Sequence, residues 1–166
     1  MSRDFSDREF RVLDIATSRD IRLRLVEAFV LKDQFSDCLN AVKDQSQRSS
    51  YEGYLWDYFA IVKVITEVEF KSIISSSRQG YALWDLHKDI KTQEGNALGV
   101  EMGSVVQGAL PYLLEKAPLL PEDIYFCPED LSWIISMTHT YFDSGERYCT
   151  KSYPKKNSGQ TDRIIL

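Results

Sequence analysis

The sequence has few cysteines and no long apolar segment. Its three cysteines, Cys38, Cys127 and Cys149, are an odd number and lie far apart, so they do not form the framework of a disulfide-stabilised protein. The apolar runs extend for only a few residues, well short of the roughly 20 that cross a bilayer. The first residues also lack the apolar stretch of a signal peptide. These absences predict a cytoplasmic protein with reduced thiols and without membrane association.

The sequence also lacks the short motifs that identify common enzymes. It contains no Gly-rich phosphate loop, no nucleophile elbow and no closely spaced pair of metal ligands. We therefore expect no cofactor and no bound metal, and a non-enzymatic role is favoured over catalysis. An enzyme stays open as the alternative.

The negative charge of the chain argues against a nucleic-acid surface. The net charge is −5 at pH 7, although residues 151–166 contain four basic residues and one acidic residue. The rest of the chain is therefore more acidic than the whole. Since phosphate contacts need clustered Lys and Arg, this charge argues against nucleic acid. It suits a basic protein partner, and it equally suits an ordinary protein that its charge keeps soluble.

Length and composition predict one domain. With 166 residues and 43% hydrophobic content, the chain is long enough for one substantial core and too short for two ordinary domains. We expect this domain at residues 1–153 and a flexible tail at 154–166, which is rich in Lys, Asn, Ser, Gly and Gln. The order of the predicted elements indicates an α+β fold. N-terminal helices are followed by a mixed sheet of about five strands, with helices mainly on one face.

Two capping patterns predict where helices begin. Residues 6–9 read Ser-Asp-Arg-Glu, a capping box that places a first helix near Asp7. Residues 66–69 read Thr-Glu-Val-Glu and predict a helix at 67–79, which Gly80 would end as a C-terminal cap. Apolar periodicity, and a proline that suits a first helical turn, predict further helices at 19–34, 36–45 and 110–116.

Aromatic and β-branched residues predict the strands. Residues 54–65 are almost continuously apolar, which predicts a central strand, and a helix stays open as an alternative for the first half of this stretch. Residues 88–99 are charged and predict a loop. The other predicted strands are 81–87, 100–107, 123–127, 133–140 and 147–149.

Two histidines are the candidate general bases. In strand alternation His139 shares a face with apolar residues such as Ile135 and Met137, which predicts a buried structural role. His87 ends a predicted strand beside charged residues and is expected at the surface. The alternative is a small hydrolase or transferase that uses Asp85, His87 and His139 in a cleft at the strand ends.

Carboxylates and cysteines within the predicted strands offer weaker candidates. Asp57 and Asp85 lie in apolar stretches, where an unpaired charge is costly to bury, so each is expected at the surface or paired. Cys127, His139 and Cys149 fall on three consecutive strands, and strand pairing could gather them as metal ligands or as a Cys-His pair. Zinc sites usually place two ligands within a few residues, so plain core cysteines are favoured.

Tyrosines near loops and acidic side chains indicate a binding surface. The chain has nine Tyr, eight Phe and three Trp, most of which a core of this size requires. A Tyr ring at a loop offers contact area at little entropic cost, while scattered surface tyrosine is the plain alternative. Acidic loops at 85–101 and 143–146 would cover the partner. The residues predicted to bind are Asp85, Asp89, Glu94, Tyr141, Asp143, Glu146 and Tyr148.

Two short motifs resemble those of a family of small bacterial proteins whose domain has no assigned function. Its members carry Leu-Trp-His-x-Phe in mid-chain and Trp-Thr-x-x-x-Thr-His-Glu before an aromatic pair. The resemblance covers residues 54–150 and implies a fold more than an activity. Asp57 stands where the family has His, and Thr140 where it has Glu, so any chemistry of those two residues is lost here. The matching positions are Leu55, Trp56, Phe59, Trp133, Thr138, His139 and Tyr148.

Small acidic α+β proteins of this size also resemble bacterial immunity proteins in general character. The leading hypothesis is therefore a protein-binding protein of the immunity or antitoxin type, which blocks a basic toxin by covering it. A homo-oligomer formed through an open edge strand is a further alternative.

Overall fold

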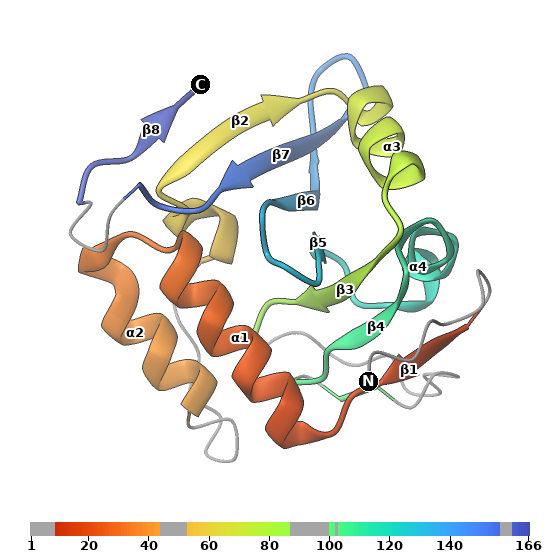
Figure 1. Cartoon of the computed structure of the whole chain (residues 1–166). Helices are drawn as coiled ribbons and strands as arrows, with labels where there is room; N and C mark the ends of the chain where they lie inside the picture. The colour runs from red at the N-terminus through yellow and green to blue at the C-terminus, as the bar shows by residue number, and fades with distance from the viewer. Residues whose placement is uncertain (1–8, 44–52, 87–99, 102, 157–160) are drawn as a thin grey trace.

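The computed structural model describes residues 9–43, 53–86, 100–101, 103–156 and 161–166. Within them one mixed sheet forms the centre of the molecule (Figure 1). Its strands are β1 (Phe10–Val12), β2 (Ile61–Ile65), β3 (Gln79–Trp84), β4 (Val106–Ala109), β5 (Ile124–Pro128), β6 (Ile134–Tyr141), β7 (Arg147–Tyr153) and β8 (Ile164–Ile165). They lie in the order β1-β4-β3-β5-β6-β7-β2-β8. Every neighbouring pair is antiparallel except β2 and β8, which run parallel.

Helices cover both faces of this sheet. They are α1 (Ile15–Phe29), α2 (Lys32–Lys43), α3 (Glu67–Ser76) and α4 (Leu110–Lys116), with short 3-10 helices η2 (Leu55–Tyr58) and η3 (Ala117–Leu119). The α1–α2 pair packs over one buried core, which includes Tyr125, and the α3–α4 pair over another, which includes Phe126. Adjacent residues of β5 therefore point into opposite cores, as expected of a strand buried on both faces. None of the helices in the described ranges has the length and apolarity of a membrane span.

The α+β class is confirmed, but details of the predicted architecture are wrong. The described chain has eight strands rather than about five, because pairings as short as β1 and β8 carry too few residues for a periodic pattern. Helices lie on both faces rather than mainly one, since the apolar central strands need cover on both sides. The sheet also does not simply follow N-terminal helices, because β1 comes before α1, while α3 and α4 lie between strands, close to the ranges 67–79 and 110–116 predicted for them.

The first helix starts later than the capping pattern at residues 6–9 predicts. Phe10–Val12 form β1, which pairs with β4 at the sheet edge, and α1 begins only at Ile15. Its N-cap is Asp14, whose Oδ1 accepts a hydrogen bond from the backbone N–H of Thr17 at 2.9 Å. A cap of this kind satisfies one of the amide donors that a helix start leaves unpaired.

The second capping pattern is confirmed, whereas the predicted role of Gly80 is wrong. The hydroxyl of Thr66 accepts from the N–H of Glu69 at 3.1 Å, and the Glu69 carboxylate accepts from the N–H of Thr66 at 2.9 Å. Helix α3 ends at Ser76, and Gly80 lies within β3. A Cβ atom at Gly80 would approach the carbonyl oxygen of Cys127 to 2.2 Å. Glycine is therefore needed here because β3 and β5 pass so closely.

The last described residues extend the sheet. Strand β8 pairs with β2, and the N–H of Leu166 donates to the carbonyl oxygen of Val62 at 2.8 Å. The guanidinium of Arg163 donates to the carbonyl oxygens of Trp56 at 3.1 Å and Asp57 at 3.0 Å. The segment expected to form a tail thus contacts both β2 and the η2 turn.

Candidate functional site

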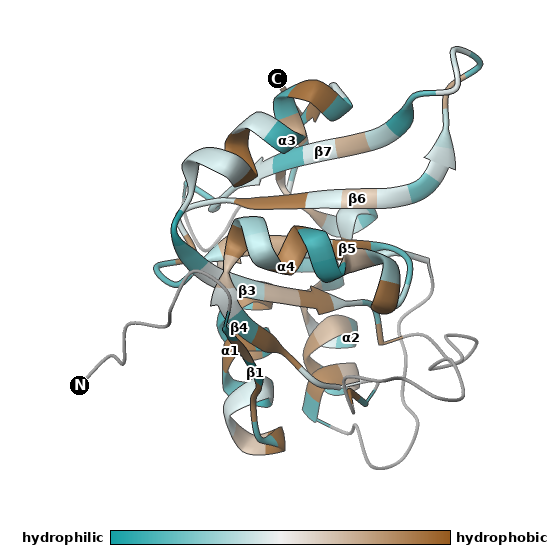
Figure 2. Ribbon diagram, turned by 90° about the vertical axis from the view of Figure 1, so that its right-hand side faces the viewer, coloured by the Kyte–Doolittle hydropathy of each residue, from teal (hydrophilic) through white to brown (hydrophobic). Residues whose placement is uncertain are grey.

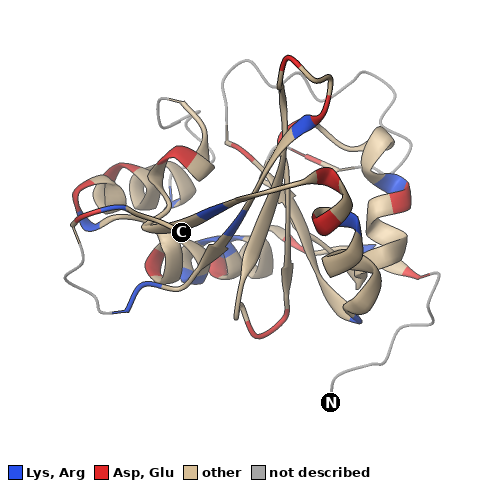
Figure 3. Cartoon of the chain, turned by 90° about the horizontal axis from the view of Figure 1, so that it is seen from above, with Lys and Arg blue, Asp and Glu red and all other residues tan. Residues whose placement is uncertain are grey.

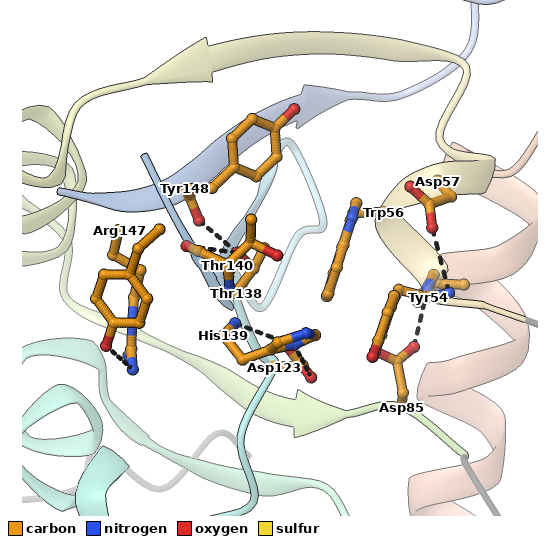
Figure 4. Close-up of polar contacts among 12 residues, drawn as sticks. Tyr54, Trp56, Asp57, Asp85, Asp123, Thr138, His139, Thr140, Arg147 and Tyr148 are labelled. Carbon is orange, nitrogen blue, oxygen red and sulfur yellow. Dashed lines mark hydrogen bonds and ion pairs between the residues drawn. The ribbon is translucent and has the colours of Figure 1, made fainter. Parts of the chain in front are cut away.

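Polar and aromatic side chains gather at the end of the sheet where β3 stops and β5 starts (Figure 4). Trp84, the last residue of β3, pairs with Ile124, the first residue of β5. Asp85, which follows β3, and Asp123, which precedes β5, therefore lie at the same edge of the sheet. His139, near the end of the adjacent strand β6, and the η2 turn complete the group. The site is therefore assembled from four separate stretches of the chain.

Asp123 holds both the backbone and the ring of His139. Its Oδ1 accepts from the backbone N–H of His139 at 2.8 Å, and the ring Nδ1 lies 2.8 Å from Oδ1 and 2.9 Å from Oδ2. Asp123 has φ +59°, a left-handed conformation that is uncommon outside glycine and that Asp adopts more readily than most residues. Both carboxylate oxygens are thereby directed at the neighbouring strand.

The neutral ring of His139 is consequently fixed in one tautomer. An ionised carboxylate only accepts hydrogen bonds, so Nδ1 carries the proton and Nε2 the lone pair. The His139 side chain is 41% exposed, against 9% for Asp123, and no described residue hydrogen-bonds to Nε2. The prediction of a buried His139 is wrong, because the pairing of β6 with β7 shifts register between Met137 and Tyr141. That shift interrupts the alternation on which the prediction rested.

Two aromatic rings lie beside His139. The rings of Tyr54 and Trp56 stack with their centroids 4.2 Å apart and their planes 3° from parallel. The His139 ring centroid is 5.1 Å from that of Tyr54 and 6.4 Å from that of Trp56. Trp56 is only 6% exposed, so it supports the partly exposed Tyr54 ring from the core side. In the stretch 54–65, predicted as a strand with a helix left open for its first half, the first part forms the 3-10 helix η2 and the second part forms β2.

Carboxylates surround these rings. The pKa of the Tyr54 phenol is raised above its ordinary value, first by burial and then by the negative charges of Asp123, Asp85, Asp57 and Glu122, in that order. Negative neighbours raise the pKa of a phenol because its ionised form is an anion. Asp57 and Glu122 are exposed. This end of the sheet therefore presents an acidic surface.

Asp85 belongs to the core beneath this surface. It is fully buried, with Oδ1 accepting from the N–H of Leu55 at 2.9 Å and Oδ2 from the hydroxyl of Tyr125 at 2.7 Å. The Tyr125 oxygen accepts in turn from the N–H of Trp56 at 3.3 Å. Asp85 was expected either at the surface or paired, and the structure shows it paired through these hydrogen bonds. The predictions that Asp85 contacts a partner or a substrate are wrong, because the residue is fully buried. Its hydrogen bonds attach η2 to β3 and β5.

Strands β6 and β7 continue beyond the sheet as a projecting hairpin (Figure 2). The N–H of Phe142 donates to the carbonyl oxygen of Glu146 at 2.8 Å, and the N–H of Gly145 donates to that of Phe142 at 2.9 Å. Gly145 has φ +83°, which glycine adopts without strain. On this closed turn Tyr141 is 56% exposed and Phe142 45% exposed.

Contacts within the hairpin hold both exposed rings. Phe142 packs edge-on against Tyr148, with centroids 5.5 Å apart. The guanidinium of Arg147 lies 5.3 Å from the Tyr141 ring centroid and donates to its hydroxyl at 2.9 Å. Rings that are already fixed lose little entropy on binding. Of the residues predicted to bind, those exposed on this hairpin are Tyr141, Asp143 and Glu146, while Tyr148 is partly buried.

The remaining predicted residues, His87, Asp89 and Glu94, lie outside the described residues. Asp57, the other carboxylate expected at the surface or paired, is exposed, and its Oδ2 accepts from the N–H of Tyr54 at 3.4 Å.

Strand pairing does not gather Cys127, His139 and Cys149 into one site. Cys127 points into the core under α1 and α2, and Cys149 into the core under α3 and α4. Burial raises the pKa of the Cys149 thiol to about 11 and also raises that of Cys127, so both thiols keep their protons at neutral pH. Within the described ranges, no three His, Cys, Asp or Glu side chains lie close enough together to hold a metal ion.

The residue of the candidate site that sequence reasoning missed is Asp123. It stands at the start of a predicted strand, and no local pattern shows that its carboxylate reaches His139, which is 16 positions away. Sequence order alone could have offered one signal. A carboxylate at the start of one strand and a lone histidine late in the next, antiparallel strand come to the same edge of a sheet.

Comparison with protein-family models, with curated proteins and with solved structures found no match. The resemblance to the bacterial family therefore stays a prediction from the motif residues.

Proposed function

We propose that this protein acts by binding another protein, with the end of the β6–β7 hairpin as its contact surface. The observation that carries the proposal is the exposure of Tyr141 and Phe142, at 56% and 45%, on a turn that its own hydrogen bonds close. Exposed aromatic rings on a rigid projection are the kind of anchor that dominates interface energies. A partner that buries both rings would gain their apolar area without first ordering the hairpin.

The charge around the hairpin favours a basic partner. Asp143 and Glu146 are exposed next to the two rings, and the chain as a whole carries −5. In Figure 3 Lys and Arg are scattered over separate elements of the described chain. Opposite fields speed the encounter of two proteins and fix their relative orientation. An inhibitor of a basic toxin, as in an immunity or antitoxin pair, would use such a surface to cover the toxin.

Comparative affinity capture tests the hairpin as the contact surface. The tagged chain and a Tyr141→Ser/Phe142→Ser variant are used to capture proteins from the same lysate. Val68→Ser is the matched control, because Val68 is an apolar residue of α3 that is 73% exposed. We expect one basic protein in near-equal amount with the parent chain and with the control, and its loss with the hairpin variant. Equal capture by all three chains rejects the hairpin as the contact surface.

A second variant tests the contribution of charge. Asp143→Asn/Glu146→Gln keeps the size of both side chains and removes their charge. We expect slower association with the captured protein and a weaker dependence of the rate on salt, with a smaller change in dissociation. An unchanged association rate would show that these two carboxylates do not face the partner.

One observation favours a second candidate, an acid–base enzyme. Asp123 hydrogen-bonds to Nδ1 of the His139 ring, whose side chain is 41% exposed. A carboxylate that orients a solvent-accessible imidazole is the arrangement that proton transfer by histidine uses. Asp123 here takes the place of the buried Asp85 in the predicted catalytic group. A panel of ester, amide and phosphoester substrates tests this candidate. Turnover that His139→Gln abolishes would establish it, and turnover that survives the substitution would reject it.

A further inference from the structure

We propose that the basic partner also binds an apolar stripe on the sheet, which runs from the hairpin over β7 and β2 to β8. The stripe consists of Phe142, Tyr148, Val64 and Ile165. In Figure 1 these three strands lie side by side at one end of the sheet. This inference rests on the proposed function and adds the chemistry of the partner's surface, which combines apolar side chains with basic ones.

The two rings of the hairpin tip are too small for a stable protein interface. A specific interface buries about 800 Å² on each partner. A Tyr or Phe ring buries roughly 150–250 Å² when it is fully enclosed, and Tyr141 and Phe142 are only 56% and 45% exposed. The two rings therefore supply well under half of the area that a stable complex needs. A partner that binds through them must contact further surface as well.

The strand register places the rest of the stripe on one face of the sheet. Cys149 points into the core under α3 and α4, so its neighbour in β7, Tyr148, points to the opposite face. Val62 points into the core under α1 and α2, and Val64, two positions along β2, lies on the same side. Ile165 pairs with Val62 in the parallel pair of β2 and β8, so it faces that side as well.

Members of the stripe are also neighbours across the strands. The Phe142 ring packs edge-on against Tyr148 with centroids 5.5 Å apart. Val64 is opposite Thr150 in the pairing of β2 with β7, which makes it a diagonal neighbour of Tyr148. Side chains in that relation lie about 7–8 Å apart, within reach of an aromatic ring. Ile165 is the diagonal neighbour of Val64 on the other side, because it pairs with the residue two positions before it.

Most of the stripe is exposed to solvent. Val64 is 42% exposed and Ile165 72% exposed, and with Phe142 they form three large apolar side chains that α1 and α2 leave uncovered. Single apolar residues scattered over a surface need no explanation, whereas adjoining ones mark a surface that another molecule covers. The stripe therefore supplies the further apolar area that a partner at the hairpin requires.

Carboxylates lie at both ends of the stripe and favour a partner with basic side chains around its apolar ones. Asp143 and Glu146 are exposed at the hairpin end. At the other end Arg163, two positions before Ile165, donates to the carbonyl oxygen of Asp57 at 3.0 Å, so η2 and its exposed Asp57 border β8. An apolar centre within a polar, charged rim is the usual composition of a protein interface. Opposite charges would then set the orientation in which the partner's apolar side chains meet the stripe.

Titration of the full chain with a synthetic peptide tests the stripe. The probe is a peptide of alternating leucine and arginine, and the control peptide has serine in place of every leucine, so that both carry the same charge. Binding is followed by the NMR methyl signals of Val64 and Ile165, which are assigned by their loss in Val64→Thr and in Ile165→Thr. We expect saturable shifts of both signals with the leucine-arginine peptide and several-fold weaker binding of the serine-arginine peptide. Equal affinity for the two peptides, or no saturable shift at these two residues, contradicts the stripe.

A polar variant then tests whether the partner uses the stripe. Val64→Thr/Ile165→Thr keeps β-branched side chains in both strands and places a hydroxyl at each position. Val68→Thr is the matched control, since Val68 is 73% exposed on α3, which packs on the opposite face of the sheet. We expect the double variant to bind the leucine-arginine peptide and the captured partner several-fold more weakly, and the control to bind both as the parent chain does. Unaltered binding by the double variant contradicts the stripe.

These measurements distinguish failure of this inference from failure of the proposed function. If no partner is captured, the protein-binding role is rejected, while the peptide titration still accepts or rejects the stripe as a surface for basic, apolar chains. If a partner is lost with the hairpin variant and retained with Val64→Thr/Ile165→Thr, the protein-binding role stands and the stripe is rejected.

Discussion

Nδ1 of His139 lies 2.8 Å from Oδ1 of Asp123, and within this pair the imidazole is exposed while the carboxylate is buried. The pair joins β6 to the residue that starts β5, and the same Asp123 also accepts the backbone N–H of His139. The carboxylate therefore sets both the path of the strand and the orientation of the ring that the strand presents.

The tautomer of His139 follows from this geometry. We expect long-range ¹H–¹⁵N spectra of the neutral ring to show a protonated Nδ1 and an unprotonated Nε2. In Asp123→Asn the amide offers one acceptor oxygen instead of two, so the other tautomer should gain population. A ring protonated mainly at Nε2 in the parent chain would contradict the hydrogen bond to Asp123.

Removal of the buried carboxylate of Asp85 should destabilise the fold. Asp85→Ala takes the acceptor away from the N–H of Leu55 and from the hydroxyl of Tyr125, at a cost of about 1–3 kcal/mol for each buried donor left without its partner. Urea unfolding measures the loss. Asp37→Ala, on the exposed side of α2, is the control and should stay within about 0.5 kcal/mol of the parent chain. Equal midpoints for the two variants would show that Asp85 does not hold η2.

The capping box of α3 should give a pH-dependent contribution to stability. The pKa of Glu69 is lowered, first by the hydrogen bond from the backbone N–H of Thr66 and then by that from its hydroxyl. The unfolded chain therefore binds a proton at higher pH than the folded chain does. The stabilisation of the folded chain by the Glu69 carboxylate is complete above the pKa of about 4.3 that Glu has in the unfolded chain. It is lost as the pH falls through the lower pKa that Glu69 has in the folded chain.

Thr66→Ala should accordingly cost about 1 kcal/mol at pH 7 and less at pH 3, as measured by denaturant unfolding at both pH values. Ser72→Ala, on the exposed surface of the same helix, should have little effect at either pH. A cost that does not change with pH would mean that the Glu69 carboxylate takes no part in the cap.

The three thiols should resist modification while the chain is folded. Burial raises the pKa of Cys38 to about 12 and that of Cys149 to about 11, and it also raises that of Cys127. At pH 8 all three stay protonated, and the thiolate is the reactive form. We expect an aromatic disulfide reagent to label no cysteine in buffer and all three in denaturant. Rapid labelling of any cysteine in the folded chain would contradict its burial.

These same thiols should make the fold less stable at high pH. The unfolded chain releases thiol protons near pH 8.5, while the folded chain keeps them to higher pH. The contribution of the protonated thiols to the free energy of unfolding is therefore complete below about pH 8.5, and it is lost as the pH rises through the raised pKa values of the folded chain.

Local signals in the sequence predicted local structure well. The Thr66–Glu69 box and the proline in the first turn of α4 depend only on neighbouring residues, and both helices start where these signals place them. The predicted role of Gly80 was wrong because a distant segment of the chain, rather than the neighbouring residues, requires glycine at this position. It is needed where the carbonyl oxygen of Cys127 approaches from β5, and a glycine after a helix looks the same in sequence whether it ends the helix or admits a second strand.

The candidate site was harder to predict because it depends on strand order. Asp85, Asp123 and His139 lie close together because β5 is placed between β3 and β6 in the sheet. The sequence alone did not reveal that order. Periodicity also assumed a regular β6, whereas the register shift after Met137 turns His139 toward solvent. The exposed tyrosine and acidic residues of the hairpin were easier to find, because a turn between two strands exposes its tip whatever the strand order.

Amide hydrogen exchange of the chain, alone and bound to its captured partner, tests the central claim most directly. The claim predicts that exchange slows at residues 139–147 of the hairpin on binding, while α2, which packs on the other face of the sheet from α3, is unchanged. Protection confined to other surfaces, or the capture of no specific partner at all, would contradict it.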